Sequence, residues 1–290
     1  MMKKDRIPLE PQKAGTDTLF QLPKSESVPV FCLWQKLEEL YRRYNRVEYI
    51  SPDPLEFVVL QRDWRDCEVV GLVAGSLAFG SVVQINRSVG LVLEVLVEPR
   101  RCVLEMPRRE LSRAFNGFRH RYTDGGNLID LLLGIRRVLE RYGTLEECFR
   151  EGLREEDETV LPALDLFVAR LREGFDGRRN YLLSSPCDGS ACKRMHLYLR
   201  WMVRRDSVDP GPWHDVPAAK LVVPLDTHMH RVALRLGLTR RKQANGATAV
   251  EITRAFRSVV PEDPVKYDFA LTRPGIRREL VDDPFWGSIG

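Results

Sequence analysis

Two residues in the C-terminal half have types and positions that could do chemistry. The first is Asp226, which lies in the segment PLDTHMHRVALRLGL at 224–238, directly before a predicted helix. An aspartate at such a position is a favoured N-cap, because its carboxylate accepts hydrogen bonds from the free N–H groups of the first helical turn. It is therefore either a structural cap or a carboxylate that supports a developing cation and assists proton transfer.

The second residue is Lys193, which precedes Asp226 by 33 positions in the segment CDGSACKRMHLYLRWMVRRD at 187–206. A lysine amine attacks an electrophilic carbon once it has lost its proton, which burial beside apolar groups or neighbouring cations promotes. Arg194 and Met195 could supply such surroundings. Because most lysines on a helix are simply solvated, the alternative is a surface cation.

The 224–238 segment, P-L-D-T-H-x-x-R-V-x-x-R-L-G-L, resembles V-D-T-H-x-x-R-V-x-x-R-L-G of the helix-hairpin-helix DNA glycosylases. In that superfamily the aspartate is the catalytic carboxylate. The resemblance thus implies that Asp226 is catalytic and that a nucleophile precedes it, close to a glycine hairpin that binds a phosphate through backbone N–H groups.

The segment around Lys193 is similar to that hairpin, which commonly reads L-P-G-x-G-x-K and ends in the lysine nucleophile of the bifunctional members. Gly189 matches the first glycine and Lys193 the lysine, while Ala191 replaces the second glycine and Cys187-Asp188 replace Leu-Pro. The resemblance implies contacts to the DNA backbone from residues of both segments: Gly189, Ser190, Arg194, His228 and Arg231.

The interval between lysine and aspartate is longer than in most of the superfamily. The archaeal 8-oxoguanine glycosylase branch has a similarly enlarged interval and a degenerate hairpin, and the chain resembles this branch. From about residue 40 to 275 it also resembles an uncharacterised bacterial family that shares S-A-C-K-R, L-R-W-M-V-R-R-D, P-L-D-T-H and D-P-V-K-Y-D-F-A-L. That family often has F-G where this chain has Thr272-Arg273.

These resemblances imply a DNA glycosylase with AP lyase activity that excises an oxidised purine, with 8-oxoguanine as the expected lesion. Lys193 would attack C1′ of an extruded nucleotide, Asp226 would stabilise the oxocarbenium-like transition state, and the resulting Schiff base would allow β-elimination. The expected partner is DNA containing a damaged base, and neither a metal nor another cofactor is required.

Two other functions stay open. A non-catalytic nucleic-acid-binding protein on the same scaffold would use a basic face but has no use for both Lys193 and Asp226. A helical interaction module unrelated to nucleic acid would bind its partner without the salt dependence of phosphate contacts.

Selection of a base requires aromatic surfaces and a few polar groups. A tryptophan on a helix is also commonly a core residue, so each assignment has a structural alternative. The candidates for a base pocket are Trp201, Trp213, Phe79, Gln84 and Tyr267.

Apolar residues that recur at three and four positions, with few alternating patterns, predict an all-α fold. Block 69–98 predicts two buried helices with a break near Phe79-Gly80. We expect a two-lobed helical bundle of the helix-hairpin-helix glycosylase type over 29–290, with the site in the cleft between the lobes, after a flexible arm at 1–28. The other predicted helices are 31–44, 127–142, 144–151, 158–173, 190–205, 227–236 and 247–258.

Composition places the chain among ordinary globular proteins, with 43% hydrophobic residues and a formal charge of +4. Residues 190–245 hold eleven Lys and Arg against four Asp, which indicates a phosphate-docking face or a solvated helix face. Six scattered cysteines without a CxxC pair indicate reduced thiols and no zinc site. No apolar run predicts a membrane span. With the reduced thiols and the DNA partner that the resemblance implies, we expect a cytoplasmic, nucleoid-associated monomer.

Overall fold

The computed structural model describes residues 30–175, 180–277, 280 and 283–285, and the expected arm at 1–28 lies outside them. The described residues form an all-α fold with one two-stranded antiparallel sheet, which confirms the predicted fold class. The helices are α1 (Val30–Tyr44), α2 (Leu55–Val59), α3 (Trp64–Leu77), α4 (Val82–Val95), α5 (Pro99–Glu105), α6 (Arg108–Ala114), α7 (Gly125–Tyr142), α8 (Leu145–Arg150), α9 (Leu161–Arg172), α10 (Lys193–Val203), α11 (Thr227–Arg235), α12 (Gly246–Arg257) and α13 (Asp268–Ile276), and the strands are β1 (Arg119–His120) and β2 (Thr123–Asp124).

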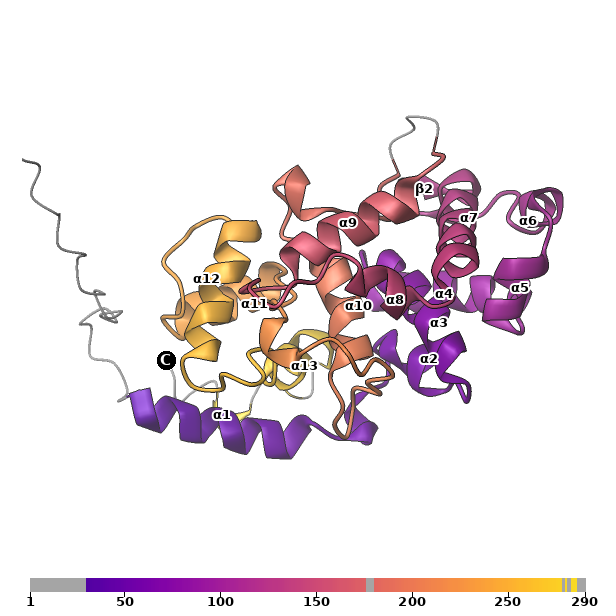
Figure 1. Ribbon diagram of the computed structural model, residues 1–290. Coiled ribbons are helices and arrows are strands. Elements are labelled where there is room, and N and C mark those ends of the chain that lie inside the picture. The colour runs from indigo at the N-terminus through magenta and orange to yellow at the C-terminus, as the bar shows by residue number, and fades with distance from the viewer. Residues whose placement is uncertain (1–29, 176–179, 278–279, 281–282, 286–290) are drawn as a thin grey trace, which may run out of the picture.

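Helix α10 lies near the centre of the molecule (Figure 1). Helices α1 and α11–α13 lie on one side of it, and α2–α7 lie on the other. Its main neighbour is α3, and two glycines of α3 allow the close approach. A Cβ at Gly75 would lie 3.3 Å from the carbonyl oxygen of Arg194 and 3.2 Å from Tyr198 Cβ. The missing side chain therefore sets how near α3 lies to the first turn of α10.

The predicted break between the two apolar helices is confirmed at Gly80. This glycine has a φ of +106°, which L-residues rarely adopt, and Ser81 then caps α4 by accepting a hydrogen bond from Gln84 N–H at 3.3 Å. The break leaves Phe79 at a corner between α3 and α4. This corner forms part of the site described below.

Helix α1 packs against α13 and is tied to the C-terminal end of the chain. The guanidinium of Arg43 lies 2.6 Å from Asp283, and the hydroxyl of Tyr44 donates a hydrogen bond to the same carboxylate. Glu38 forms an ion pair with Lys266, just before α13. The first and last described helices of the chain therefore form one layer.

Several elements were not predicted from the sequence: α2, α5, α6, α13 and the β1–β2 hairpin. Four of them are short, and α13 contains Pro274, which removes a backbone donor. No helix among the described residues has the length and apolar character needed to cross a bilayer.

Segment 190–245 was predicted to present its basic residues on a phosphate-docking face or on a solvated helix face, and two of these residues lie on neither. Arg200 and Arg204 are only 1% and 4% exposed, and ion pairs with buried aspartates offset the cost of burying both charges. Arg231 and Arg240 are exposed and remain accessible to solvent.

Candidate active site

Lys193 and Asp226 line the same cavity, which has a volume of about 540 Å³. Its walls come from the α3–α4 corner, from the first half of α10, from the start of α11 and from α13. The ammonium nitrogen of Lys193 lies 3.4 Å from Oδ2 of Asp226, and each side chain is about one third exposed. The fold thus brings an amine and a carboxylate together at an accessible cavity.

Asp226 is the N-cap of α11 and faces the lysine at the same time. Its Oδ1 accepts hydrogen bonds from the N–H groups of His228 at 2.9 Å and Met229 at 2.8 Å. These bonds fix the plane of the carboxylate, so that Oδ2 is held toward Lys193. A capping role therefore does not exclude a chemical role for this carboxylate, because one oxygen caps the helix and the other faces the lysine.

Lys193 is the first residue of α10 and follows a sharp bend of the chain. Cys192 has a φ of +46°, a left-handed conformation that is uncommon for residues other than glycine, and its N–H donates to Ser190 Oγ at 3.1 Å. The bend ends the preceding turn and starts the helix at Lys193. The lysine side chain consequently leaves the helix at its N-terminal end, beside the cavity.

The expected hairpin is a short 3-10 turn over Pro186–Asp188 that ends at Gly189, whose φ is +70°. Asp165 of α9 anchors this turn, because its carboxylate accepts from Cys187 N–H at 2.9 Å and from the hydroxyl of Ser185. Gly189 and Ser190 are exposed and line a hollow of about 380 Å³ together with Lys193. A phosphate at this hollow would lie next to the lysine.

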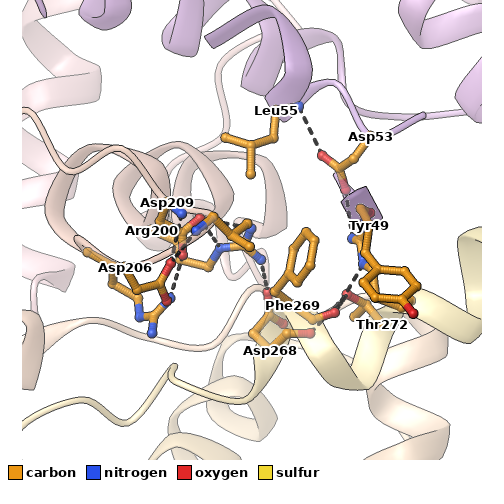
Figure 2. A network of polar contacts seen from close by, with 12 residues as sticks. Tyr49, Asp53, Leu55, Arg200, Asp206, Asp209, Asp268, Phe269 and Thr272 are labelled. Carbon is orange, nitrogen blue, oxygen red and sulfur yellow. Dashed lines mark hydrogen bonds and ion pairs between the residues drawn. The ribbon is translucent and has the colours of Figure 1, made fainter. Parts of the chain in front are cut away.

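The floor of the cavity carries charged groups that are almost completely buried. Arg200 lies between Asp209 and Asp268, and Arg273 pairs with Asp53 at 2.7 Å (Figure 2). The NH1 group of Arg200 is 2.5 Å from Asp268 Oδ2. The floor is therefore polar and ordered by ion pairs.

Asp268 carries an acceptor atom at the floor that the described part of the chain leaves unsatisfied. Among the described residues its Oδ1 has no hydrogen-bond partner, although the side chain is only 3% exposed and lines the cavity. Burial raises the pKa of Asp268; Arg200 opposes this effect and the charge of Asp226 adds to it. The pKa of Asp53, in contrast, lies below its usual value. Burial acts to raise this pKa, but the neighbouring guanidinium of Arg273 lowers it by more.

Two of the five residues predicted for the base pocket lie near the cavity. Phe79 lines its wall, and the carboxamide oxygen of exposed Gln84 lies beside Gly80 at the rim. Arg194 stacks on Phe79, with its Cζ 4.9 Å from the ring centroid.

The other three predicted pocket residues are core residues, which corrects that part of the prediction. Trp201 is completely buried and does not line the cavity. Trp213 packs against Phe149 and Tyr198, with its indole N–H donating to Glu68. Tyr267 donates to Glu38 and helps to attach α1.

The residues predicted to contact the DNA backbone have different surroundings. Arg194 is largely committed to the protein, because its NH1 donates to the carbonyl oxygen of Ser76 at 3.0 Å, and its burial lowers its pKa. His228 lines the cavity, and its Nε2 lies 3.2 Å from the carbonyl oxygen of Leu271. Arg231 is exposed.

Three residues of the cavity floor were not predicted from the sequence: Asp268, Arg200 and Arg273. Asp268 lies in the D-P-V-K-Y-D-F-A-L block and Arg200 in L-R-W-M-V-R-R-D, so both shared blocks contained a signal. Nothing in the local pattern of either block indicates that the two side chains meet. Among the described residues no group of three or more His, Cys, Asp or Glu side chains is arranged to hold a metal ion.

Over residues 53–277, most of the chain, the sequence matches the family described as protein of unknown function (DUF2400). The chain therefore belongs to this family. No curated protein and no solved structure matches it significantly.

Proposed function

We propose that this protein is a DNA glycosylase with AP lyase activity, in which Lys193 is the nucleophile and Asp226 the supporting carboxylate. The observation that carries the proposal is the distance of 3.4 Å between these groups at the wall of a 540 Å³ cavity. The resemblance of both segments to helix-hairpin-helix glycosylases supports the same assignment. The expected substrate class is an oxidised purine such as 8-oxoguanine.

The reaction starts with a damaged nucleotide extruded into the cavity, at a cost of a few kcal/mol that contacts in the cavity offset. Asp226 accepts a proton from the ammonium of Lys193, and the free amine bonds to C1′ while the bond from C1′ to the base nitrogen breaks. The departing base takes the bonding electrons and gains the proton that Asp226 had accepted, and the nitrogen of Lys193, now bonded to C1′, releases its extra proton to the carboxylate. Because Oδ1 is held by the helix, the carboxylate stays in place while positive charge develops on the sugar.

The covalent intermediate then becomes a Schiff base: the bond between C1′ and the ring oxygen breaks, the oxygen takes the electron pair and a proton from water, and the nitrogen of Lys193 forms a double bond to C1′. Loss of a proton from C2′ breaks the bond between C3′ and its phosphate oxygen, which cuts the strand. Each step uses only the amine, the carboxylate and water. The amine is released by hydrolysis of the Schiff base.

The polar floor suits a purine. The unpartnered Oδ1 of Asp268 can accept an N–H group of the base, and Arg200 holds the opposite oxygen of this carboxylate. Phe79 offers an aromatic surface in the same cavity. A base that lacks a suitable N–H donor would leave Asp268 unpaired, and such a mismatch discriminates strongly between ligands.

The test is capture of the Schiff base by sodium borohydride, which reduces the C=N bond to a stable amine. The wild-type protein is incubated with duplexes that carry 8-oxoguanine, an abasic site or undamaged guanine, and adducts are separated by denaturing electrophoresis. We expect adducts with the first two duplexes, and loss of capture in Lys193→Ala.

The matched control is Lys242→Ala, which removes an exposed lysine that does not line the cavity. This variant should retain capture, although one lost positive charge will weaken binding slightly at low salt. Absence of an adduct with every lesion, or an undiminished adduct in Lys193→Ala, contradicts the proposal. If no lesion gives an adduct but the protein still binds DNA in a salt-dependent manner, a non-catalytic nucleic-acid-binding protein is favoured.

A further inference from the structure

Aromatic side chains continue outward from the cavity onto the surface. Phe79 lines the cavity, and Tyr122 stacks on it with ring centroids 5.1 Å apart and an angle of 29° between the planes. Tyr181 and Tyr122 lie in an edge-to-face arrangement, with ring centroids 5.4 Å apart and an angle of 80° between the planes. Tyr122 is 60% exposed and Tyr181 43%, which is high for such large apolar rings. A ring that is covered on one side and open on the other is suited to stacking.

The β1–β2 hairpin holds Tyr122 in this position. Two residues, Arg121 and Tyr122, connect the strands, and Arg121 has a φ of +54°. His120 attaches the hairpin to the helices: its Nε2 is 2.9 Å from the carbonyl oxygen of Phe79 and its Nδ1 is 2.9 Å from the hydroxyl of Ser88. Because a carbonyl oxygen can only accept, Nε2 carries the proton and Ser88 donates to Nδ1. The tip of the hairpin is therefore fixed beside the cavity.

The surroundings of these rings are positively charged. The guanidinium of Arg121 reaches over Gly80, and Arg194 stacks on the ring of Phe79. Among the described residues Arg194 forms no ion pair with a carboxylate, so the structure does not neutralise its charge locally. Exposed aromatic rings next to arginines are typical of surfaces that bind unpaired nucleobases, because the rings stack on bases while the arginines attract phosphates.

We propose that Tyr122, supported by Phe79, stacks on an unpaired nucleobase of the bound nucleic acid outside the cavity. The proposal rests on the nucleic-acid partner of the proposed function and assigns a second contact for the same substrate. A duplex from which one nucleotide has been extruded contains such a base, because the partner of that nucleotide has lost its pairing. Because Tyr122 stacks on Phe79 of the cavity wall, a base bound to Tyr122 would lie next to the nucleotide extruded into the cavity.

The test compares binding of the full chain to two duplexes, one intact and one with a single tetrahydrofuran abasic analogue, which leaves the opposite base unpaired. We expect preference for the second duplex in the wild-type protein. Since one stacked base contributes roughly a 5- to 150-fold change in affinity, Tyr122→Ala should lose most of this preference while Tyr122→Phe retains it. Circular dichroism should be unchanged, because the ring is mostly exposed.

Trp64→Ala is the matched control, since Trp64 is also an exposed aromatic residue with an arginine 5.0 Å from its ring but lies at the other end of α3. The Trp64→Ala variant should keep the preference for the duplex with the abasic analogue. If Tyr122→Ala binds both duplexes like the wild-type protein, the stacking proposal is wrong while borohydride capture can still succeed. A preference that depends on Tyr122, without any capture, would support stacking and contradict the proposed catalysis.

Discussion

At the scale of single residues, Asp226 joins an observed role as a helix cap to the catalytic role that we propose for it. An oxygen of the carboxylate caps α11 and the other faces Lys193, so the residue supports both the helix and the proposed chemistry. A substitution that keeps the cap and removes the charge separates the two roles.

Asp226→Asn is this substitution. Asparagine caps helices about as well as aspartate, so we expect the melting temperature to change little and DNA binding to persist. Base release should fall by about two orders of magnitude or more, because the neutral amide can neither take the proton of Lys193 nor stabilise positive charge on the sugar. Single-turnover excision from an 8-oxoguanine duplex measures the effect. Turnover equal to that of the wild-type protein would refute the role of Asp226.

At the scale of elements, close contacts between helices depend on glycines. A Cβ at Gly134 of α7 would lie 2.3 Å from the carbonyl oxygen of Leu171 in α9, and backbone cannot move aside as a flexible side chain can. In contrast, a Cβ at Gly90 of α4 would have no atom within 4 Å. The same substitution at the two positions should therefore have opposite effects.

We expect Gly134→Ala to destabilise the protein by about 1–3 kcal/mol or more, because it forces α7 and α9 apart. Gly90→Ala should stabilise it by roughly 0.5–1 kcal/mol, since alanine loses less backbone entropy in a helix. Urea unfolding at constant pH gives both free energies. Equal effects of the two substitutions would show that the packing of α7 on α9 tolerates a shift.

For the whole molecule, stability should depend on pH through buried His196. Burial lowers the pKa of this imidazole to about 4, so the folded chain keeps it neutral where the unfolded chain, with an ordinary value near 6.5, binds a proton. Because the unfolded state then holds more protons at this residue, the contribution of His196 to the free energy of unfolding falls on acidification below about pH 6.5.

The expected contribution of His196 is a loss of about 2 kcal/mol between pH 7.5 and pH 5. In His196→Gln this part of the pH dependence should disappear, whereas in His214→Gln, with an exposed imidazole, it should remain. Urea unfolding at the two pH values provides the measurement. An identical pH dependence in wild-type and His196→Gln protein would contradict a neutral buried imidazole.

The sequence predicted the long helices and the segments of the site because both depend on local pattern. Apolar periodicity predicted α1 and α7, and the glycine after Phe79 indicated the break between α3 and α4. Lys193 and Asp226 were predicted from the resemblance of their segments to known motifs. The burial of Trp201 and Trp213 could not be predicted, since a ring in the core and one in a pocket have the same local pattern. The pairing of Arg200 with Asp268 joins residues 68 positions apart and exists only in three dimensions.

The attachment of α1 to the C-terminal layer has a consequence for biosynthesis. Tyr44 and Asp283 are 239 residues apart. At a translation rate of about 5–20 residues per second, α1 is therefore synthesised roughly 10–50 seconds before its partner. During that interval its apolar face has to be shielded by other means, and a nascent chain stalled before Asp283 cannot complete this layer.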